Sequence, residues 1–232
     1  MEKKYTFEDY LNVVRALRAP GGCPWDSKQT HESLRPYMVE EAYEVLDGIR
    51  ILKQTGQADN LCEELGDVLL QVLLHSVIAE EEGYFQIEDV IDGGCRKMIR
   101  RHPHVFPEES GQKALERPDW DEIKRREKGY DSPSDEILSI PLELPSLLRM
   151  QKVYRKKKKI FGETHTLRES ADNIRDMLSA IEASDGGDDG ERIAAILEEV
   201  CAIAEERGVN AEQSLADGAQ KILDKYRQTV YK

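Results

Sequence analysis

Aromatic residues are scarce in this chain: only 6% of its 232 residues are Phe, Trp or Tyr, whereas 34% carry a charge. No segment of useful length alternates apolar and polar residues with the period of two that a half-buried strand requires. Both shortages argue against a β-rich protein. The length allows one large domain or two small ones. We therefore expect a helical, well-solvated protein.

Positive charge is also in short supply, because 46 acidic residues outnumber 33 basic ones and give a formal net charge of -13. This balance argues against a protein that binds nucleic acid or an anionic membrane. The four cysteines have no CxxC spacing, so we expect free thiols in a reducing compartment. We find no signal-peptide pattern and no apolar run approaching a membrane span, and we expect a cytoplasmic location.

Two pairs of acids stand out in the first half of the chain. Glu41 and Glu44 form the first pair, and Glu64 and Asp67 form the second. The i,i+3 spacing puts both members of a pair on one face of a helix, with Cβ atoms roughly 5–6 Å apart. At 100° per residue, Glu41 falls inside the apolar stripe of its own helix. The first pair is therefore expected to point toward a core.

The second pair belongs to a narrow polar stripe that continues with Gln71 and His75 and is flanked by leucines and valines on both sides. Like charges gathered near a core repel one another, and burying them without compensation is costly. Four convergent carboxylates predict a hard divalent cation with oxygen ligands, most simply Mg²⁺, with Mn²⁺ as the alternative. A solvated helix face is the simpler alternative. No ExxH motif occurs, which disfavours a ferritin-like di-iron centre.

Helical patterns cover nearly the whole chain and predict an all-α fold built of helix bundles. The expected helices span residues 6–18, 34–54, 59–82, 87–101, 119–128, 143–160, 167–183, 191–207 and 211–229. The two halves resemble each other weakly. Aligning the glycines that end the second long helix of each half puts Arg192 and Ala195 near the columns of Glu64 and Asp67. Aligning the preceding helices puts Asn173 and Asp176 at Glu41 and Glu44, so the second half is expected to lack the metal.

Several stretches in the first half resemble the MazG family of nucleoside triphosphate pyrophosphohydrolases. They are residues 22–26 (GCPWD), 29–33 (QTHES), 40–44 (EEAYE), 63–72 (EELGDVLLQV), 100–106 (RRHPHVF) and 120–124 (WDEIK). The resemblance implies tandem helical domains, homodimers, Mg²⁺, and cleavage of NTPs or dNTPs to the monophosphate and pyrophosphate, in the control of nucleotide pools. We expect a MazG-like domain at 1–130 with the intact metal site, a linker at 131–139, and a degenerate MazG-like domain at 140–232.

Other residues are candidates for catalysis or substrate binding. Glu40 and Glu63 lie roughly 100° from their acidic neighbours, and either one could orient the attacking water or simply be solvated. Lys97, Arg100 and Arg101 suit the triphosphate, although a basic last helical turn is also favoured by the helix dipole.

Both tryptophans, Trp25 and Trp120, could stack on the base or fill the core, and the resemblance favours base contact for Trp25. Lys124 and Lys128 could cover the substrate or be surface residues. The basic run 155–159 (RKKKK) is an anion patch or, more simply, an exposed helix face.

The sequence leaves two rival functions open. One is a narrow dUTP/dCTP-type or phosphoribosyl-ATP-type hydrolase on a similar bundle, against which the CPWD and RRHPHVF stretches argue. The other is a catalytically weak nucleotide-binding regulatory protein that acts through a partner. The eroded second half motivates it, and the intact carboxylates of the first half oppose it.

Overall fold

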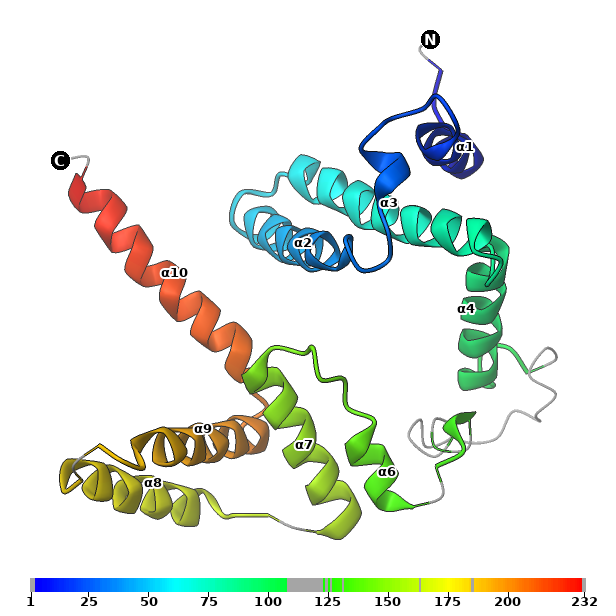
Figure 1. Ribbon diagram of the computed structural model, residues 1–232. Helices are drawn as coiled ribbons and strands as arrows, with labels where there is room; N and C mark the ends of the chain where they lie inside the picture. The colour runs from blue at the N-terminus through cyan, green and yellow to red at the C-terminus, as the bar shows by residue number, and fades with distance from the viewer. Residues whose placement is uncertain are drawn as a thin grey trace. The chain divides into compact units, whose positions relative to one another are not determined.

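The computed structural model describes residues 3–107, 123, 125, 127–130, 132–162, 164–184 and 186–230, except for the side chains of 133 and 227–230. All regular structure in this part of the chain is helical, which confirms the all-α fold class (Figure 1). The elements are α1 (Phe7–Arg18), η1 (Asp26–Lys28), α2 (Arg35–Thr55), α3 (Asp59–Glu81), α4 (Ile87–Arg101), α6 (Pro133–Leu138), α7 (Ser146–Phe161), α8 (Leu167–Glu182), α9 (Asp189–Glu206) and α10 (Ala211–Val230). Most of the helix expected at 119–128 lies outside the described residues.

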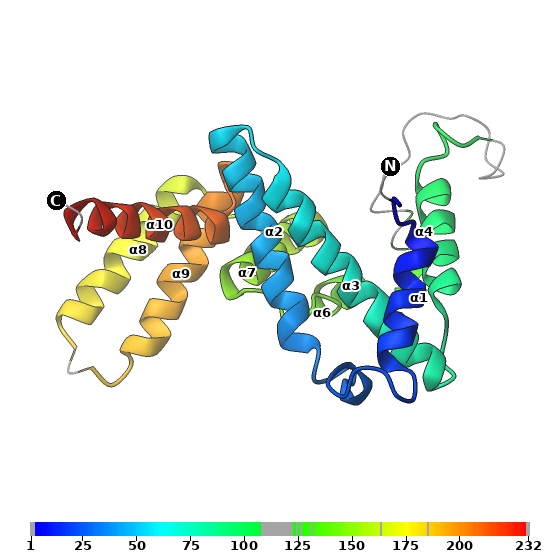
Figure 2. The ribbon, with the colours of Figure 1, turned by 90° about the horizontal axis from the view of Figure 1, so that it is seen from above.

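The chain forms two compact units, Met1–Arg117 and Pro118–Lys232. In the first, α2 and α3 lie side by side as a hairpin, and α1 and α4 each pack on α3 (Figures 1 and 2). Gly56 ends α2 with a φ of 76°, in the left-handed region that glycine adopts without a steric penalty. The short loop that follows returns the chain into α3.

The core of the first unit surrounds the second half of α3. Its buried residues are Leu11, Val14, Leu34, Leu73, Leu74, Val77, Ile78 and Ile87. Thr6 begins α1 with a capping box, because its hydroxyl accepts from the Asp9 N–H and the Asp9 carboxylate accepts from the Thr6 N–H. The first half of α3 projects beyond this core, and its acidic residues are only half-buried or exposed.

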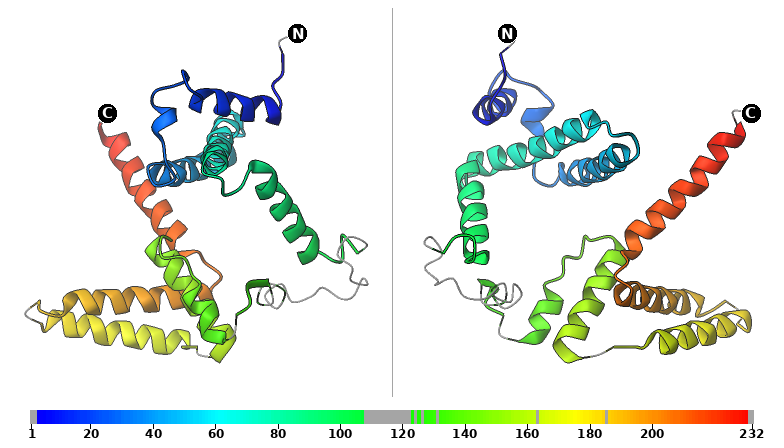
Figure 3. Two further views of the ribbon diagram at one scale, coloured as in Figure 1. Left: turned by 45° about the vertical axis from the view of Figure 1, so that its right-hand side comes forward. Right: turned by 180° about the vertical axis from the view of Figure 1, so that it is seen from behind.

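The second unit repeats the pairings of the first. Its α8 and α9 form a hairpin, α7 packs on α9 as α1 packs on α3, and α10 follows α9 as α4 follows α3 (Figure 3). The ends of α3 and α9 also match. The Tyr84 N–H donates to the Ala79 carbonyl and the Val209 N–H to the Ala204 carbonyl, both at 2.8 Å, across glycines of positive φ. The weak internal repeat of the sequence is therefore a repeat of structure.

Two details differ from the sequence predictions. The expected linker 131–139 contains α6, which packs against α7, because Ser132 and Asp135 form a capping box that starts a helix. The predicted alignment of the repeat is also three residues out. Counted back from Gly83 and Gly208, which follow the two helices, Asp189 takes the place of Glu64 and Arg192 that of Asp67, instead of Arg192 and Ala195.

Two further predictions concern thiols and membranes. All four cysteines are free thiols, as expected from their spacing. Among the described residues, no helix has both the length and the apolar character that a membrane crossing requires.

Candidate metal centre

A close approach of α2 to α3 sets the geometry of the acidic residues. Gly48 is buried in α2, and a Cβ atom added there would lie 3.0 Å from the Leu61 Cα and 3.1 Å from the Asn60 Oδ1. A glycine inside a helix costs about 0.5–1 kcal/mol relative to alanine. The close packing against Leu61 and Asn60 explains the glycine at this position, because a larger residue would push the two acid-bearing helices apart.

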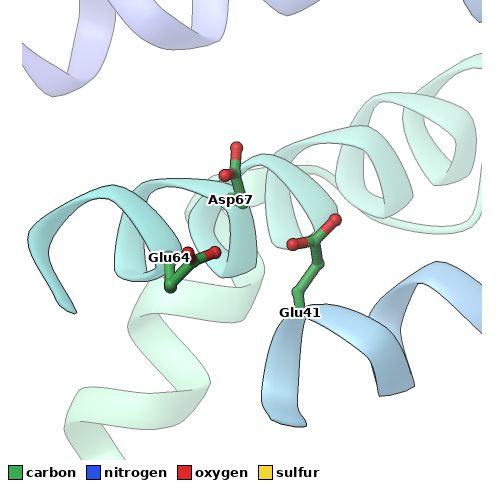
Figure 4. Close-up of side chains that lie close together, drawn as sticks. All are labelled: Glu41, Glu64 and Asp67. Carbon is green, nitrogen blue, oxygen red and sulfur yellow. The ribbon is translucent and has the colours of Figure 1, made fainter. Parts of the chain in front are cut away.

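Three of the four predicted metal ligands converge across this hairpin. Glu41 on α2 and Glu64 and Asp67 on α3 each present a carboxylate oxygen, and these oxygens lie within 4.8 Å of one another (Figure 4). In the described part of the chain this is the only group of three or more acidic, His or Cys side chains with such convergence. Glu44, the fourth predicted ligand, is exposed on α2 and stands outside the group.

The carboxylates of this cluster repel one another. Burial raises the pKa of Glu41 above its ordinary value, and the negative charges of Asp67 and Glu44 raise it further. Burial also raises the pKa of Glu64, together with the charges of Glu44, Glu63 and Asp67, although a hydrogen bond from Asn60 opposes the shift. Glu44 is therefore close enough for its charge to act on the cluster. A bound divalent cation would relieve this repulsion.

Two residues that the sequence did not single out support the cluster. The Asn60 amide donates to the Glu64 Oε1 at 2.7 Å and so orients this carboxylate. The Tyr10 hydroxyl donates to the Gly66 carbonyl at 3.3 Å, and both burial and the charge of Asp67 raise the pKa of Tyr10. The i,i+4 spacing of Asn60 and Glu64 was readable in the sequence. The Tyr10 contact was not, because it joins α1 to α3.

The polar stripe of α3 continues past the cluster, toward the C-terminal end of the helix. Gln71, one turn after Asp67, is only 5% exposed, and its Oε1 is the one buried side-chain oxygen or nitrogen without a partner among the described residues. An acceptor left in this position suits a water molecule of a hydrated cation. One turn further, the His75 Nδ1 lies 2.7 Å from the His31 Nδ1, with the two rings stacked. His75 is therefore hydrogen-bonded to His31 and lies about two helical turns after Asp67 in α3.

The two tryptophans were predicted to contact the substrate, and the structure describes one of them. Trp25 is 51% exposed and meets the Tyr37 ring edge to face at 5.9 Å, so it does not fill the core. Trp120 and Lys124 lie outside the described residues.

Lys97 and Arg100 are exposed and Arg101 is half-buried on α4. This helix runs away from α3 at the end of α3 opposite to the cluster (Figures 1 and 3). Asp67 precedes that end by about four helical turns, or roughly 20 Å at 1.5 Å per residue. In a single copy of the chain, the structure therefore does not bring these cations to the carboxylates.

The chemistry of this donor set fits a hard cation. It contains only carboxylates, with an amide and a phenol behind them, and it has no thiolate or imidazole among the converging atoms. Mg²⁺ is typically held by one or two carboxylates and keeps several waters, and it then binds phosphate oxygens. Fold and site together define an all-α protein whose helical hairpin carries a cluster of carboxylates suited to a divalent metal.

Comparison with known proteins narrows this class. The family model of the MazG nucleotide pyrophosphohydrolase domain matches residues 29–106, which hold all three converging acids. A Thermotoga maritima protein named nucleoside triphosphate pyrophosphohydrolase/pyrophosphatase MazG is 35% identical over 222 residues, 95% of this chain and 84% of that protein. The nucleoside triphosphate pyrophosphohydrolase of Escherichia coli K12 is 32% identical over 226 residues, 94% of this chain and 84% of that protein.

A third relative matches this chain over a smaller share of its own length. The Bacillus subtilis protein described as uncharacterized protein YabN is 47% identical over 152 residues, which are 65% of this chain but only 30% of the length of that protein. The two relatives that align along almost the whole chain are decisive for classification. The chain belongs to the MazG family of nucleotide pyrophosphohydrolases, and it is accordingly an enzyme of the hydrolase class.

Proposed function

We propose that this protein uses Mg²⁺ to hydrolyse nucleoside triphosphates, NTPs or dNTPs, to the nucleoside monophosphate and pyrophosphate, and so controls nucleotide pools. The observation that carries the proposal is the convergence of Glu41, Glu64 and Asp67 within 4.8 Å, inside the segment that matches the family model. The names of the Thermotoga and Escherichia relatives support the same reaction. Mn²⁺ is the alternative ion, since it accepts the same oxygen ligands.

Glu41, Glu64 and Asp67 would hold the metal, with Glu44 joining them after a change of side-chain rotamer. When bound, the ion neutralises charge on the phosphate oxygens and on the departing pyrophosphate. Asn60 keeps the Glu64 carboxylate oriented through its 2.7 Å hydrogen bond. In the hydrolysis, a water oxygen bonds to phosphorus, the bond between phosphorus and the α–β bridging oxygen breaks, and pyrophosphate leaves with the bridging oxygen.

The water must lose a proton in this step, and Glu40 and Glu63 are the proposed acceptors. Both side chains are exposed, so both can exchange that proton with solvent. The charge of Glu63 raises the pKa of Glu64, its neighbour in α3. Glu40 likewise precedes Glu41 in α2. Both residues stay candidates for this role.

Substrate contacts are proposed for Trp25, Trp120, Lys97, Arg100, Arg101 and Lys124. The exposed ring of Trp25 is free to stack on a base. The cations would bind the triphosphate oxygens, and those on α4 can do so only if a second copy of the chain or a movement of α4 supplies them. This requirement supports a homodimer.

An exposed apolar stripe on α2 offers a surface for such a dimer. Val39, Tyr43, Leu46 and Ile49 all lie on the side of this helix that does not face α3, and each is about half exposed. Their spacing of three or four residues makes one continuous stripe. Exposed apolar patches of this kind mark association surfaces. The stripe lies on the helix that carries Glu41, but on the face turned away from this carboxylate, so a dimer formed there would pack the second copy on the outer side of α2.

The second unit is proposed to perform no chemistry. Arg192 Nη1 pairs with the Asp189 Oδ1 at 3.1 Å at the positions that correspond to Asp67 and Glu64. Asn173, which corresponds to Glu41, donates to the buried Glu199 at 2.7 Å. A guanidinium at this place repels a metal ion. The free thiols of the four cysteines and a nucleotide substrate are consistent with a cytoplasmic protein, and the net charge of -13 disfavours nucleic acid as a partner.

Product analysis tests the reaction. Purified protein is incubated with Mg²⁺ and each of eight NTPs and dNTPs, and pyrophosphate is measured separately from orthophosphate. The proposal predicts pyrophosphate and a nucleoside monophosphate in equal amounts. Orthophosphate with a nucleoside diphosphate would contradict it, and nucleotide binding without turnover would favour a regulatory protein instead.

A further inference from the structure

The second unit contains a cavity of about 220 Å³ that is unrelated to the carboxylate cluster. It lies between α6, α7 and the segment that precedes α6. The residues that line it are Arg125, Lys128, Tyr130, Glu136, Ser139, Ile140, Pro141, Lys152 and Lys156. Four of these are cations and one is an acid, so the cavity carries a surplus of positive charge in a protein whose net charge is -13.

The single acid in this cavity is already neutralised. Glu136 is 5% exposed, and its carboxylate accepts from the Arg125 Nε at 2.5 Å and from the Lys156 Nζ at 3.0 Å. Those two cations hold its pKa below the usual range, although burial opposes them. The ion pairs also fix Arg125 and Lys156 at the cavity wall. Glu136 therefore organises the cationic lining and leaves at least two positive charges uncompensated.

Lys128 and Lys152 supply the remaining charge. Neither has an acidic partner among the described residues, and the Lys128 Nζ lies 5.7 Å from the centre of the Tyr130 ring. Burial alone would raise the pKa of Tyr130. The hydrogen bonds with Ser139 and Lys128 and the charges of Lys128 and Lys156 lower it instead. Two lysine charges therefore act on the same phenol at the cavity wall, and cations gathered in this way favour an anion.

We propose that this cavity binds a small oligophosphate anion, with inorganic pyrophosphate as the species that fits it. Lysine and arginine are the groups that bind phosphate oxygens in proteins, and the surplus charge here matches an anion with more than one negative charge. Pockets for drug-sized ligands occupy about 300–1,000 Å³, so a cavity of this size is too small for a whole nucleoside triphosphate. The site involves none of the cluster residues, and it needs neither the metal nor hydrolysis.

Isothermal titration calorimetry on the full chain tests the site, with sodium pyrophosphate as the probe and EDTA present so that no metal links the anion to the carboxylate cluster. Hydrogen bonds to charged groups contribute about 1.5–3 kcal/mol, so Lys152→Gln should weaken pyrophosphate binding about tenfold or more. Lys128→Gln should act in the same direction. Neither variant removes an ion-pair partner of Glu136, and matched circular dichroism melting curves establish that they fold.

Two controls decide where the anion binds. Lys159→Gln removes the same charge from an exposed position of α7 that does not line the cavity, and Glu41→Gln alters the carboxylate cluster. Both variants should bind metal-free pyrophosphate as the wild type does. Equal weakening in Lys152→Gln and Lys159→Gln would reduce the effect to general charge and overturn the proposal.

Two other results would also overturn it. One is the absence of binding at millimolar pyrophosphate. The other is tighter binding of a whole nucleoside triphosphate that is lost in Lys152→Gln, which would make the cavity a nucleotide site.

Discussion

Arg192 and Asp189 form an ion pair, with 3.1 Å between the guanidinium Nη1 and the carboxylate Oδ1, where the first unit has Asp67 and Glu64. Both α3 and α9 keep the same packing and the same terminal hydrogen bonds, so the repeat has preserved its architecture. What differs is the electrostatics, because Arg192 pairs with Asp189 in the second unit, whereas Glu41, Glu64 and Asp67 converge in the first. Under the proposed function, the two units share a fold but only the first performs chemistry.

The first prediction concerns the proposal that only the first unit performs chemistry. Asp176→Ala should leave the rate of pyrophosphate release unchanged, because Asp176 lacks the converging acids that a hard ion needs. Asp189→Asn should behave in the same way. The rates are compared with wild type at saturating Mg²⁺. If Asp176→Ala lost activity while its helix content and oligomeric state stayed normal, a working site would have to lie in the second unit.

The pH dependence of stability gives the second prediction. The pKa of Glu41 is raised in the folded, metal-free protein, so its charged form destabilises the fold above that pKa and the penalty disappears as pH falls through it. Metal-free Glu41→Gln should therefore unfold at a higher temperature than wild type near neutral pH, and the difference should shrink toward acidic pH. Thermal melts in EDTA across this range measure it.

The same two proteins provide an internal check. Saturating Mg²⁺ should stabilise the wild type more than Glu41→Gln, because only the intact cluster binds the ion strongly. A constant difference in melting temperature at every pH, with or without Mg²⁺, would mean that Glu41 does not sense its acidic neighbours.

Gly48 gives the third prediction. In Gly48→Ala the new Cβ atom would press on the Leu61 backbone at 3.0 Å. Overpacking costs about 1–3 kcal/mol, which the better helix propensity of alanine offsets by about 1 kcal/mol. We expect a net loss of up to about 2 kcal/mol in the free energy of unfolding, together with weaker Mg²⁺ binding, because α2 and α3 move apart.

Gly93→Ala is the matched control for this substitution. It lies in α4 with open space around its Cβ position, so it should stabilise the protein by about 0.5–1 kcal/mol. Denaturant titrations and Mg²⁺ titrations of both variants separate packing from propensity. If the two substitutions changed metal binding equally, the geometry of the site would not depend on Gly48.

The apolar stripe of α2 gives the fourth prediction. Tyr43→Lys places a charge in the middle of this stripe and should convert a homodimer into a monomer, measured by light scattering coupled to size exclusion. Leu142→Lys, at an exposed position outside the helices, should leave the mass unchanged. A dimer that survives Tyr43→Lys would have to use another face.

Local patterns in the sequence predict most of the fold. Thr6, Gly56 and Gly83 mark helix ends through caps and left-handed backbone, which depend only on neighbouring residues. The helix at Pro133 was missed because a segment rich in Ser, Pro and Asp is typical of a linker, while its capping box and its packing on α7 make it a helix. The predicted alignment of α9 was three residues out, although a count back from Gly208 in the sequence already places Asp189 opposite Glu64.

Less of the site than of the fold can be predicted from the sequence, because the site depends on contacts between helices. The spacing of Glu41, Glu64 and Asp67 indicates which faces carry acids, and the structure brings these three together. It leaves Glu44 outside, since helical periodicity gives the direction of a side chain but not its rotamer. Neither the Tyr10 contact with Gly66 nor the cationic cavity around Glu136 is visible in local spacing.

The most direct test of the central claim is the rate of pyrophosphate release by Asp67→Asn, measured at saturating nucleoside triphosphate and Mg²⁺ beside the wild type. Loss of residues that merely support metal ligands typically costs about 10–100-fold in activity, so loss of a ligand charge should cost at least about a hundredfold. We expect this loss with unchanged helix content and oligomeric state. A wild-type rate in Asp67→Asn at matched Mg²⁺ would contradict it and would mean that the catalytic metal lies elsewhere.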